Sequence, residues 1–157
     1  MMNIFSQIIS IVIASIMCLL VPVTYTAANE SLYTSRSALN SVSEYVDVVT
    51  DKGSITKADY NDFLSNLFST GMDFEVSVSR EKRLVHSIDG EVKTEYVATD
   101  FVSSKGGFSG DIECNKGDII TVTIRGKNKQ RSTQVLERML NVYTPNVDYT
   151  MTGMVRN

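Results

Sequence analysis

The sequence predicts an α+β protein in which a long N-terminal helix packs on an antiparallel sheet, accompanied by two short helices. Three observations lead to this prediction: an uncharged apolar run over residues 4–23, an amphipathic pattern that continues it to residue 49, and alternating strand patterns after residue 72. We expect residues 1–28 to form a transmembrane anchor. Residues 29–157 are then long enough for one α+β domain, which includes the amphipathic half of the long helix.

The apolar run contains 20 residues without a charged side chain. As a helix it would span about 30 Å, the thickness of the hydrocarbon layer of a bilayer. A secretion signal is the alternative, because Thr26-Ala27-Ala28 could be cleaved, but the apolar part of a signal usually covers only about 7–15 residues. We therefore expect a retained, single-pass anchor in the cell membrane.

The segment after the run has the pattern of an amphipathic helix. Counting back from Val49 in alternating steps of three and four gives a mainly apolar stripe: Val46, Val42, Leu39, Ser35, Leu32 and Ala28. The same count continues through the apolar run, and most positions between the stripe members in the second half are polar. We expect one helix of more than 40 residues, its first half in lipid and its second half against its own domain, bent at Pro22.

Turn and cap residues then divide the chain into short elements. Gly53 is placed to end the long helix, and Thr56 can cap a second helix that Gly71 ends. The expected apolar face of this second helix is Tyr60, Phe63, Leu64, Leu67 and Phe68.

Alternation with a period of two predicts the sheet. The first strand follows residue 72 and buries Phe74, Val76 and Val78. Asp89-Gly90 is the expected hairpin turn, and one face of the return strand comprises Val92, Thr94, Tyr96 and Ala98.

Further strands and a short helix complete the chain. Residues 103–111 have the composition of a loop, 112–114 of a short strand and 115–117 of a turn. The clearest strand covers 118–126 and buries Ile120, Val122 and Ile124. Ser132 can cap a helix with Val135, Leu136, Met139 and Leu140 on its apolar side, and 146–156 is a final strand.

Composition and motifs argue against catalysis. The single His86 and the two distant cysteines, Cys18 and Cys114, provide no metal site, haem site or disulfide framework. The Gly-rich stretch 105–110 lacks the Gly-Lys-Ser/Thr ending of a phosphate-binding loop. We expect no enzyme, no cofactor, no metal and no small-molecule substrate.

A basic stretch offers an alternative function. Four cations fall within seven residues: Arg125, Lys127, Lys129 and Arg131. They could let an anchored or secreted binding module recognise an anionic lipid, a wall polymer or the DNA backbone. No aromatic residue interleaves with them and the net charge is −3, so nucleic acid is a poor partner. A solvated loop is the other reading, because such charge runs usually lie on the surface.

The layout resembles the type IV pilin-like superfamily, and in its short single-pass form it looks like the tight-adherence minor pilins of bacteria. The resemblance rests on the long helix, half in the membrane and half on an antiparallel sheet, and on Pro22, which resembles the helix-bending proline of the family. It implies a non-catalytic, membrane-anchored structural subunit, pilin-like or pseudopilin-like, of a surface, secretion or conjugation apparatus, with its domain outside the cytoplasm.

The same resemblance implies that the partners are the membrane and other subunits of the assembly, contacted through the N-terminal helix. The residues that we expect to matter there are Gln7, Ala14 and Pro22. Of these, Gln7 can hydrogen-bond to a neighbouring helix inside the membrane.

Overall fold

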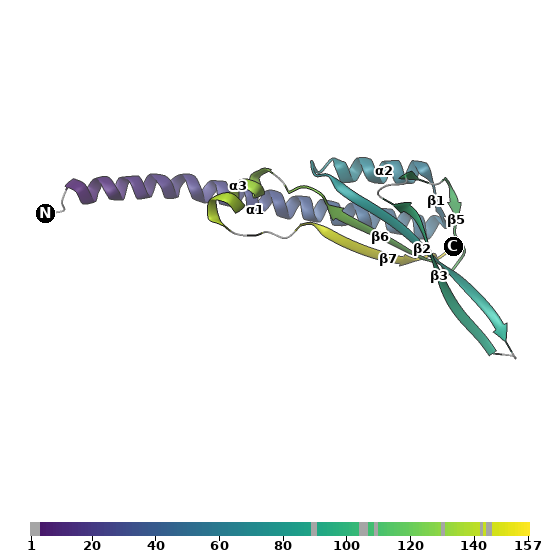
Figure 1. Cartoon of the computed structure of the whole chain (residues 1–157). Helices are drawn as coiled ribbons and strands as arrows, with labels where there is room; N and C mark the ends of the chain where they lie inside the picture. The colour runs from purple at the N-terminus through teal and green to yellow at the C-terminus, as the bar shows by residue number, and fades with distance from the viewer. Residues whose placement is uncertain are drawn as a thin grey trace. The chain divides into compact units, whose positions relative to one another are not determined.

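The computed structural model (Figure 1) describes residues 4–88, 91–103, 107–108, 110–129, 131–141, 143 and 146–157. Its elements are α1 (Ile4–Lys52), β1 (Ser54–Ile55), α2 (Lys57–Phe68), β2 (Phe74–Ile88), β3 (Glu91–Ser103), β4 (Gly107–Phe108), β5 (Ile112–Glu113), β6 (Ile119–Gly126), α3 (Arg131–Leu140) and β7 (Asp148–Met154). The predicted α+β class, with a long N-terminal helix, an antiparallel sheet and two short helices, is confirmed.

The contacts within the chain divide it into two compact units. The first unit consists of residues 1–33 and 130–144, and the second of residues 34–129 and 145–157. The helix α1 contributes its first half to one unit and its second half to the other. The helix α3 is grouped with the apolar half of α1, whereas we expected it in one domain with the sheet; that domain division stays a prediction.

The main sheet of the second unit is antiparallel, with the strand order β4-β3-β2-β6-β7. Strand β2 pairs with β6 from Phe74 to Glu81, and its remaining residues pair only with β3. A second, two-stranded sheet joins β1 to β5. We did not predict β1, because a strand of two residues has no periodicity to recognise.

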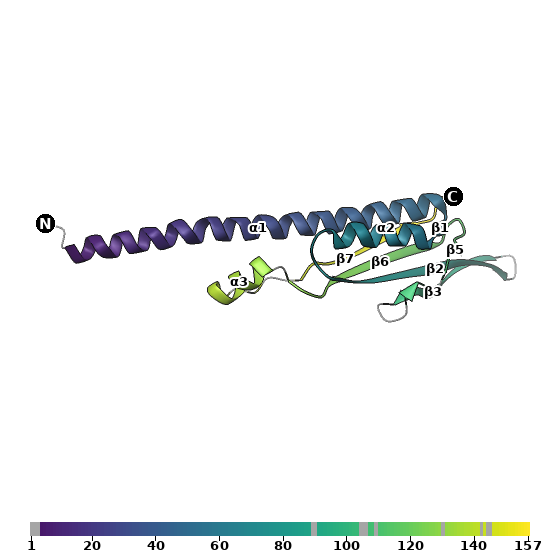
Figure 2. The same ribbon diagram turned by 90° about the horizontal axis from the view of Figure 1, so that it is seen from above.

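The core of the second unit lies between this sheet and the two helices that cover it. The second half of α1 and α2 lie side by side over one face of the sheet (Figure 2). The predicted inward positions of β2 and β6 are buried, which confirms the period-two reading: Phe74, Val76, Val78, Ile120, Val122 and Ile124. On the helices, Tyr45 of α1 stacks on Phe63 of α2 with ring centroids 4.5 Å apart.

The predicted stripe on α1 is correct near its end and wrong further back. Val42, Val46 and Val49 are buried, but Leu39 is exposed and 57% of Leu32 is exposed. Ala38 and Thr34 take the buried positions instead. Steps of three and four average 3.5 residues, whereas a straight helix has about 3.6 residues per turn, so the stripe drifts by about 20° per heptad. Over the residues between Val49 and Thr34 this drift adds up to about 40°, against about 100° between neighbouring residues, so it accounts for part of the shift of the buried line by one position.

The predicted ends of α1 and α2 are confirmed. Gly53 has a φ of 67° and its N–H donates to the carbonyl of Val49, closing α1. Thr56 caps α2, since its hydroxyl accepts from the N–H of Asp59 and donates to the carboxylate of Asp59. Phe68 is exposed, so its place on the buried face was wrong. The helix α3 starts at Arg131, one residue before the expected cap Ser132.

The far part of the β2–β3 pair forms a two-stranded arm, residues 82–88 and 91–97, which extends away from the rest of the second unit (Figure 1). The residues predicted to share one face of the return strand, Val92, Thr94, Tyr96 and Ala98, are all exposed. The reason is that β6 stops pairing at Glu81 and that no helix among the described residues covers the arm (Figure 1). The expected turn at Asp89-Gly90 lies outside the described residues.

Strand β7 packs very closely against α1. A Cβ atom on Gly153 would lie 2.6 Å from Cγ1 of Val46 and 2.8 Å from Cγ2 of Thr50. Both of these side chains are buried, so they have little room to move. Just beyond β7, the N–H of Arg156 donates to the carbonyl of Thr50 and its guanidinium pairs with Asp51 at 2.8 Å.

Candidate functional site

The apolar half of α1 is the most prominent surface of the first unit. All residues from Ile4 to Leu19 are exposed, although almost all are apolar. This helix has the length and apolar composition needed to cross a membrane, and none of its most apolar window is buried within the chain. In water such a surface would be far larger than the apolar patches of ordinary soluble proteins.

Four hydroxyl groups in this half donate to carbonyls of the helix itself. Ser10 and Ser15 each donate to the carbonyl four residues earlier, at 2.8 Å. Thr24 donates to the carbonyls of Leu20 and Val21, and Thr26 donates to that of Pro22. These side chains therefore need no water, and the segment suits an environment without hydrogen-bonding solvent.

Pro22 lies inside α1, which continues through it to Lys52. Proline has no N–H, so the carbonyl one turn earlier loses its usual donor. The hydroxyls of Thr24 and Thr26 supply additional donors to the backbone next to this position. Pro22 is thus accommodated in a continuous helix.

Gln7 and Ala14 are both exposed and lie two turns apart, on nearly the same face of α1. Cys18, also exposed, follows one turn later on this face. Gln7 makes no hydrogen bond to another residue that the structure describes, and a small residue such as Ala14 allows a second helix to approach closely. We call Gln7, Ala14 and Cys18 the helix face; Gln7 and Ala14 lie about two turns apart on it, and Pro22 follows one turn after Cys18.

Three of the four predicted cations, Arg125, Lys127 and Lys129, belong to the second unit. Arg125 pairs in register with Glu75 on one side and with Asp148 on the other, so carboxylates flank it. Lys127 and Lys129 follow in the loop after β6, beside Asp73, which accepts a 3.0 Å hydrogen bond from the Asn128 amide. Arg131 opens α3 and belongs to the first unit.

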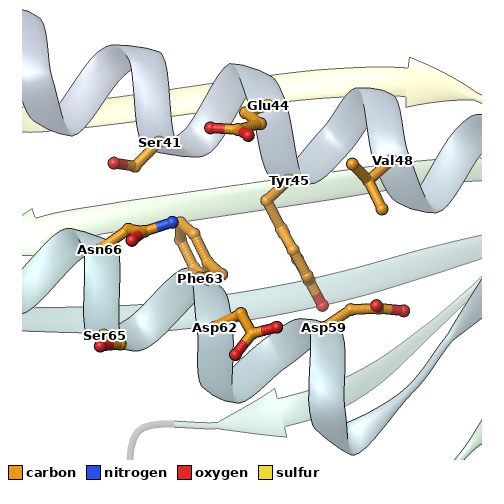
Figure 3. A pocket seen from close by; sticks show the side chains of 9 residues that line it. All are labelled: Ser41, Glu44, Tyr45, Val48, Asp59, Asp62, Phe63, Ser65 and Asn66. Atoms are coloured by element: carbon orange, nitrogen blue, oxygen red, sulfur yellow. The ribbon is translucent and has the colours of Figure 1, made fainter.

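A shallow groove of about 430 Å³ separates the second half of α1 from α2 (Figure 3). Its lining is partly acidic, and it was missed in the sequence because it joins residues of two separate helices: Ser41, Glu44, Tyr45, Val48, Asp59, Asp62, Phe63, Ser65 and Asn66. Asp59 is already bonded to Lys52 at 2.8 Å. Within the described part of the chain, no group of three or more His, Cys, Asp or Glu residues could hold a metal ion.

Tyr45 forms the inner wall of this groove. Figure 3 shows its hydroxyl directed towards the side of Asp59 and Asp62. The hydroxyl is buried and has no hydrogen-bond partner among the described residues. Burial, together with the nearby Tyr60 and Asp59, raises the pKa of Tyr45 far above its ordinary value, so the phenol stays neutral at physiological pH. A neutral, buried phenol adds no reactive group to the groove.

The most strongly buried charged groups stabilise the fold. The carboxylate of Asp118 is fully buried and lies 2.6 Å from the guanidinium of Arg80. It also accepts hydrogen bonds of 2.9 Å from the N–H groups of Arg83 and Asn115. Burial raises the pKa of Asp118, but these hydrogen bonds and the Arg80 charge outweigh it, so the pKa lies below its ordinary value.

Comparisons with known proteins give no relative. No known protein family matches the sequence, and neither the curated proteins nor the solved structures contain a significant match.

Proposed function

We propose that this chain is a membrane-anchored structural subunit without catalytic activity, pilin-like or pseudopilin-like, that assembles through its N-terminal helix. The observation that supports this most is the exposed apolar half of α1, which is continuous with a second half that is buried under its own sheet. Every described residue up to Leu19 is thus exposed, whereas one face of the second half of α1 packs in the core of the second unit.

The helix face is the proposed assembly contact. Helices in lipid associate through close packing of small residues and through hydrogen bonds between polar side chains, because lipid supplies no hydrophobic driving force. Ala14 provides the small residue and Gln7 the polar group. A neighbouring helix would satisfy the Gln7 amide, which otherwise faces hydrocarbon at a considerable free-energy cost.

The proposal includes a single-pass topology with the sheet unit outside the cytoplasm of a bacterial cell, in a surface, secretion or conjugation apparatus. The outward orientation follows from the pilin resemblance. Protease treatment of intact cells tests it: we expect cleavage of the second unit and retention of the anchor, and full protection would reverse the orientation.

Disulfide cross-linking in native membranes tests the assembly. Cys18 lies on the helix face, and replacing Cys114 by Ser leaves it as the sole thiol. We expect oxidation to form a disulfide between Cys18 and a cysteine on a neighbouring helix. That helix belongs either to a second copy of this chain or to another subunit that carries an engineered cysteine. The matched control is Ile16→Cys in a chain with Cys18→Ser and Cys114→Ser, because residue 16 lies about half a turn away from Ala14.

The outcomes separate the readings. Cross-linking at Cys18 but not at residue 16, reduced by Gln7→Leu or by Ala14→Phe, supports the helix face as the contact. Equal cross-linking at both positions would indicate random collision and would contradict the assembly proposal. Recovery of the chain in membrane-free material, starting at Asn29, would remove the anchor itself.

A further inference from the structure

The helix α3 exposes an apolar pair that its own unit does not cover. Val135 is 50% exposed and Met139 is 60% exposed, and their spacing of four residues places them on one face. Thr133, about half a turn away from Val135, is buried. One side of α3 is therefore packed, and the opposite side presents Val135 and Met139 to its surroundings.

The first unit shows where α3 is packed. Residues 130–144 share this unit only with residues 1–33. On α1 in this range, Ala27 is buried, and Leu20, Thr24 and Ser31 are partly covered, while all their neighbours are exposed. These four positions form one stripe with a helical period. Figures 1 and 2 both draw α3 beside this part of α1.

This stripe lies at the end of the apolar run. Ala27 is four residues beyond Val23, which is about 6 Å along a helix. The interfacial layer on each side of the bilayer hydrocarbon is about 5–8 Å thick, so Ala27 falls at the level of the lipid headgroups if the run spans the membrane. The helix α3, packed at this level, has its exposed apolar side at the boundary between headgroups and acyl chains.

Exposed tyrosines belong to the first unit. Tyr25, 69% exposed, is two residues beyond the run, and Tyr143, 78% exposed, follows α3 within the same unit. Tyrosine rings are enriched at membrane–water interfaces, where one end is apolar and the other is wet. The polar side of α3 includes Gln134 and Arg138, as expected of a helix that lies flat in the interface.

From these observations we infer that α3 is an interfacial helix whose Val135 and Met139 side chains insert into the bilayer beside the exit of the membrane anchor. This inference rests on the proposed membrane anchor. It assigns a second membrane contact to a segment that lies more than 100 residues after the apolar run. Two such contacts fix the tilt and rotation of α1 in the membrane more firmly than one helix does.

The chain contains no tryptophan, so a single introduced tryptophan reports its own environment. We would place it at Met139 or, in a second variant, at Val135; both sites are half exposed and tolerate a larger side chain. Leu19→Trp, in the apolar run, is the positive control. Asn61→Trp, on the exposed side of α2, is the aqueous control.

Each full-length variant is reconstituted in phosphatidylcholine vesicles with brominated acyl chains, which quench only tryptophans in contact with them. We expect strong quenching for Leu19→Trp, clear quenching with a blue-shifted emission for Met139→Trp and Val135→Trp, and none for Asn61→Trp. Acrylamide in the water should quench these variants in the reverse order.

The controls separate this inference from the anchor. If Leu19→Trp is quenched by brominated lipid while Met139→Trp and Val135→Trp both behave like Asn61→Trp, the interfacial helix is refuted and the anchor stands. If Leu19→Trp is not quenched, the anchor fails and the inference fails with it.

Discussion

Replacing Asp118 by Asn should destabilise the second unit by about 3–5 kcal/mol, because the change leaves the guanidinium of Arg80 buried without its counter-charge. Arg80 is nine-tenths buried, and its Nε and a terminal nitrogen lie 2.8 Å and 2.6 Å from one oxygen of Asp118. Asparagine keeps an oxygen that can accept from the N–H of Arg83 or of Asn115. The lost free energy is therefore mainly that of the unpaired charge.

A matched double variant isolates the charge. Arg80→Met together with Asp118→Asn removes both charges while keeping a long apolar stem and a hydrogen-bond acceptor, so we expect it to be more stable than Asp118→Asn alone. Urea unfolding in detergent micelles at pH 7, followed by tyrosine fluorescence, gives the three free energies. If the double variant is as unstable as the single one, the unpaired charge is not the cause and the reasoning is wrong.

The remaining predictions concern pH, packing and the basic stretch. The pKa values of Asp118 and Asp59 are lowered in the fold, so the stabilisation that these carboxylates provide is complete above the unfolded carboxyl pKa of about 4. It is lost as the pH falls through the lower folded pKa values. The free energy of unfolding, measured as the pH is lowered, should therefore fall less steeply in Asp118→Asn than in the unchanged protein. Tyr45→Phe removes a buried hydroxyl without a partner, so it should raise the free energy of unfolding by about 1 kcal/mol, and a loss of that size would instead show that the hydroxyl is bonded. Gly153→Ala should lower the same free energy by about 1–3 kcal/mol, because its Cβ overlaps Val46 and Thr50, and Gly153 is not among the glycines with positive φ, so backbone strain does not contribute. Changing Arg125, Lys127, Lys129 and Arg131 together to Ala should alter stability by less than about 1 kcal/mol, and weaker sedimentation of this variant with anionic liposomes would favour the binding-module alternative.

The elements that sequence reasoning predicted well are those whose pattern repeats. Strand β6 alternates Ile120, Val122 and Ile124 with polar residues over its whole length, and only one face of such a strand can be buried. The start of α2 was equally clear, since Thr56 and Asp59 have the spacing of a capping box. In both cases the signal comes from residues close together in the sequence, and the structure confirms it.

The errors arose where burial depends on distant parts of the chain. Strand β3 has the alternation of a half-buried strand, yet nothing covers the arm, and no local pattern reveals how far β6 extends. To predict which residues of α1 are buried, the true helical period has to be known over many turns. The groove between α1 and α2, and the pairing of Arg80 with Asp118, join residues far apart in sequence, which a single sequence does not bring together.

Gly153 of β7 packs closely against α1, but the ribosome makes these two elements at different times. The face of α1 that includes Val46 and Thr50 leaves the ribosome about 100 residues before β7 does, which at about 5–20 residues per second is about 5–20 s earlier. During that interval the apolar run can already enter a membrane, whereas the valines in the second half of α1 are not yet covered by β7. A nascent chain stalled before residue 148 should therefore still expose Val46 and Thr50 where β7 later covers them.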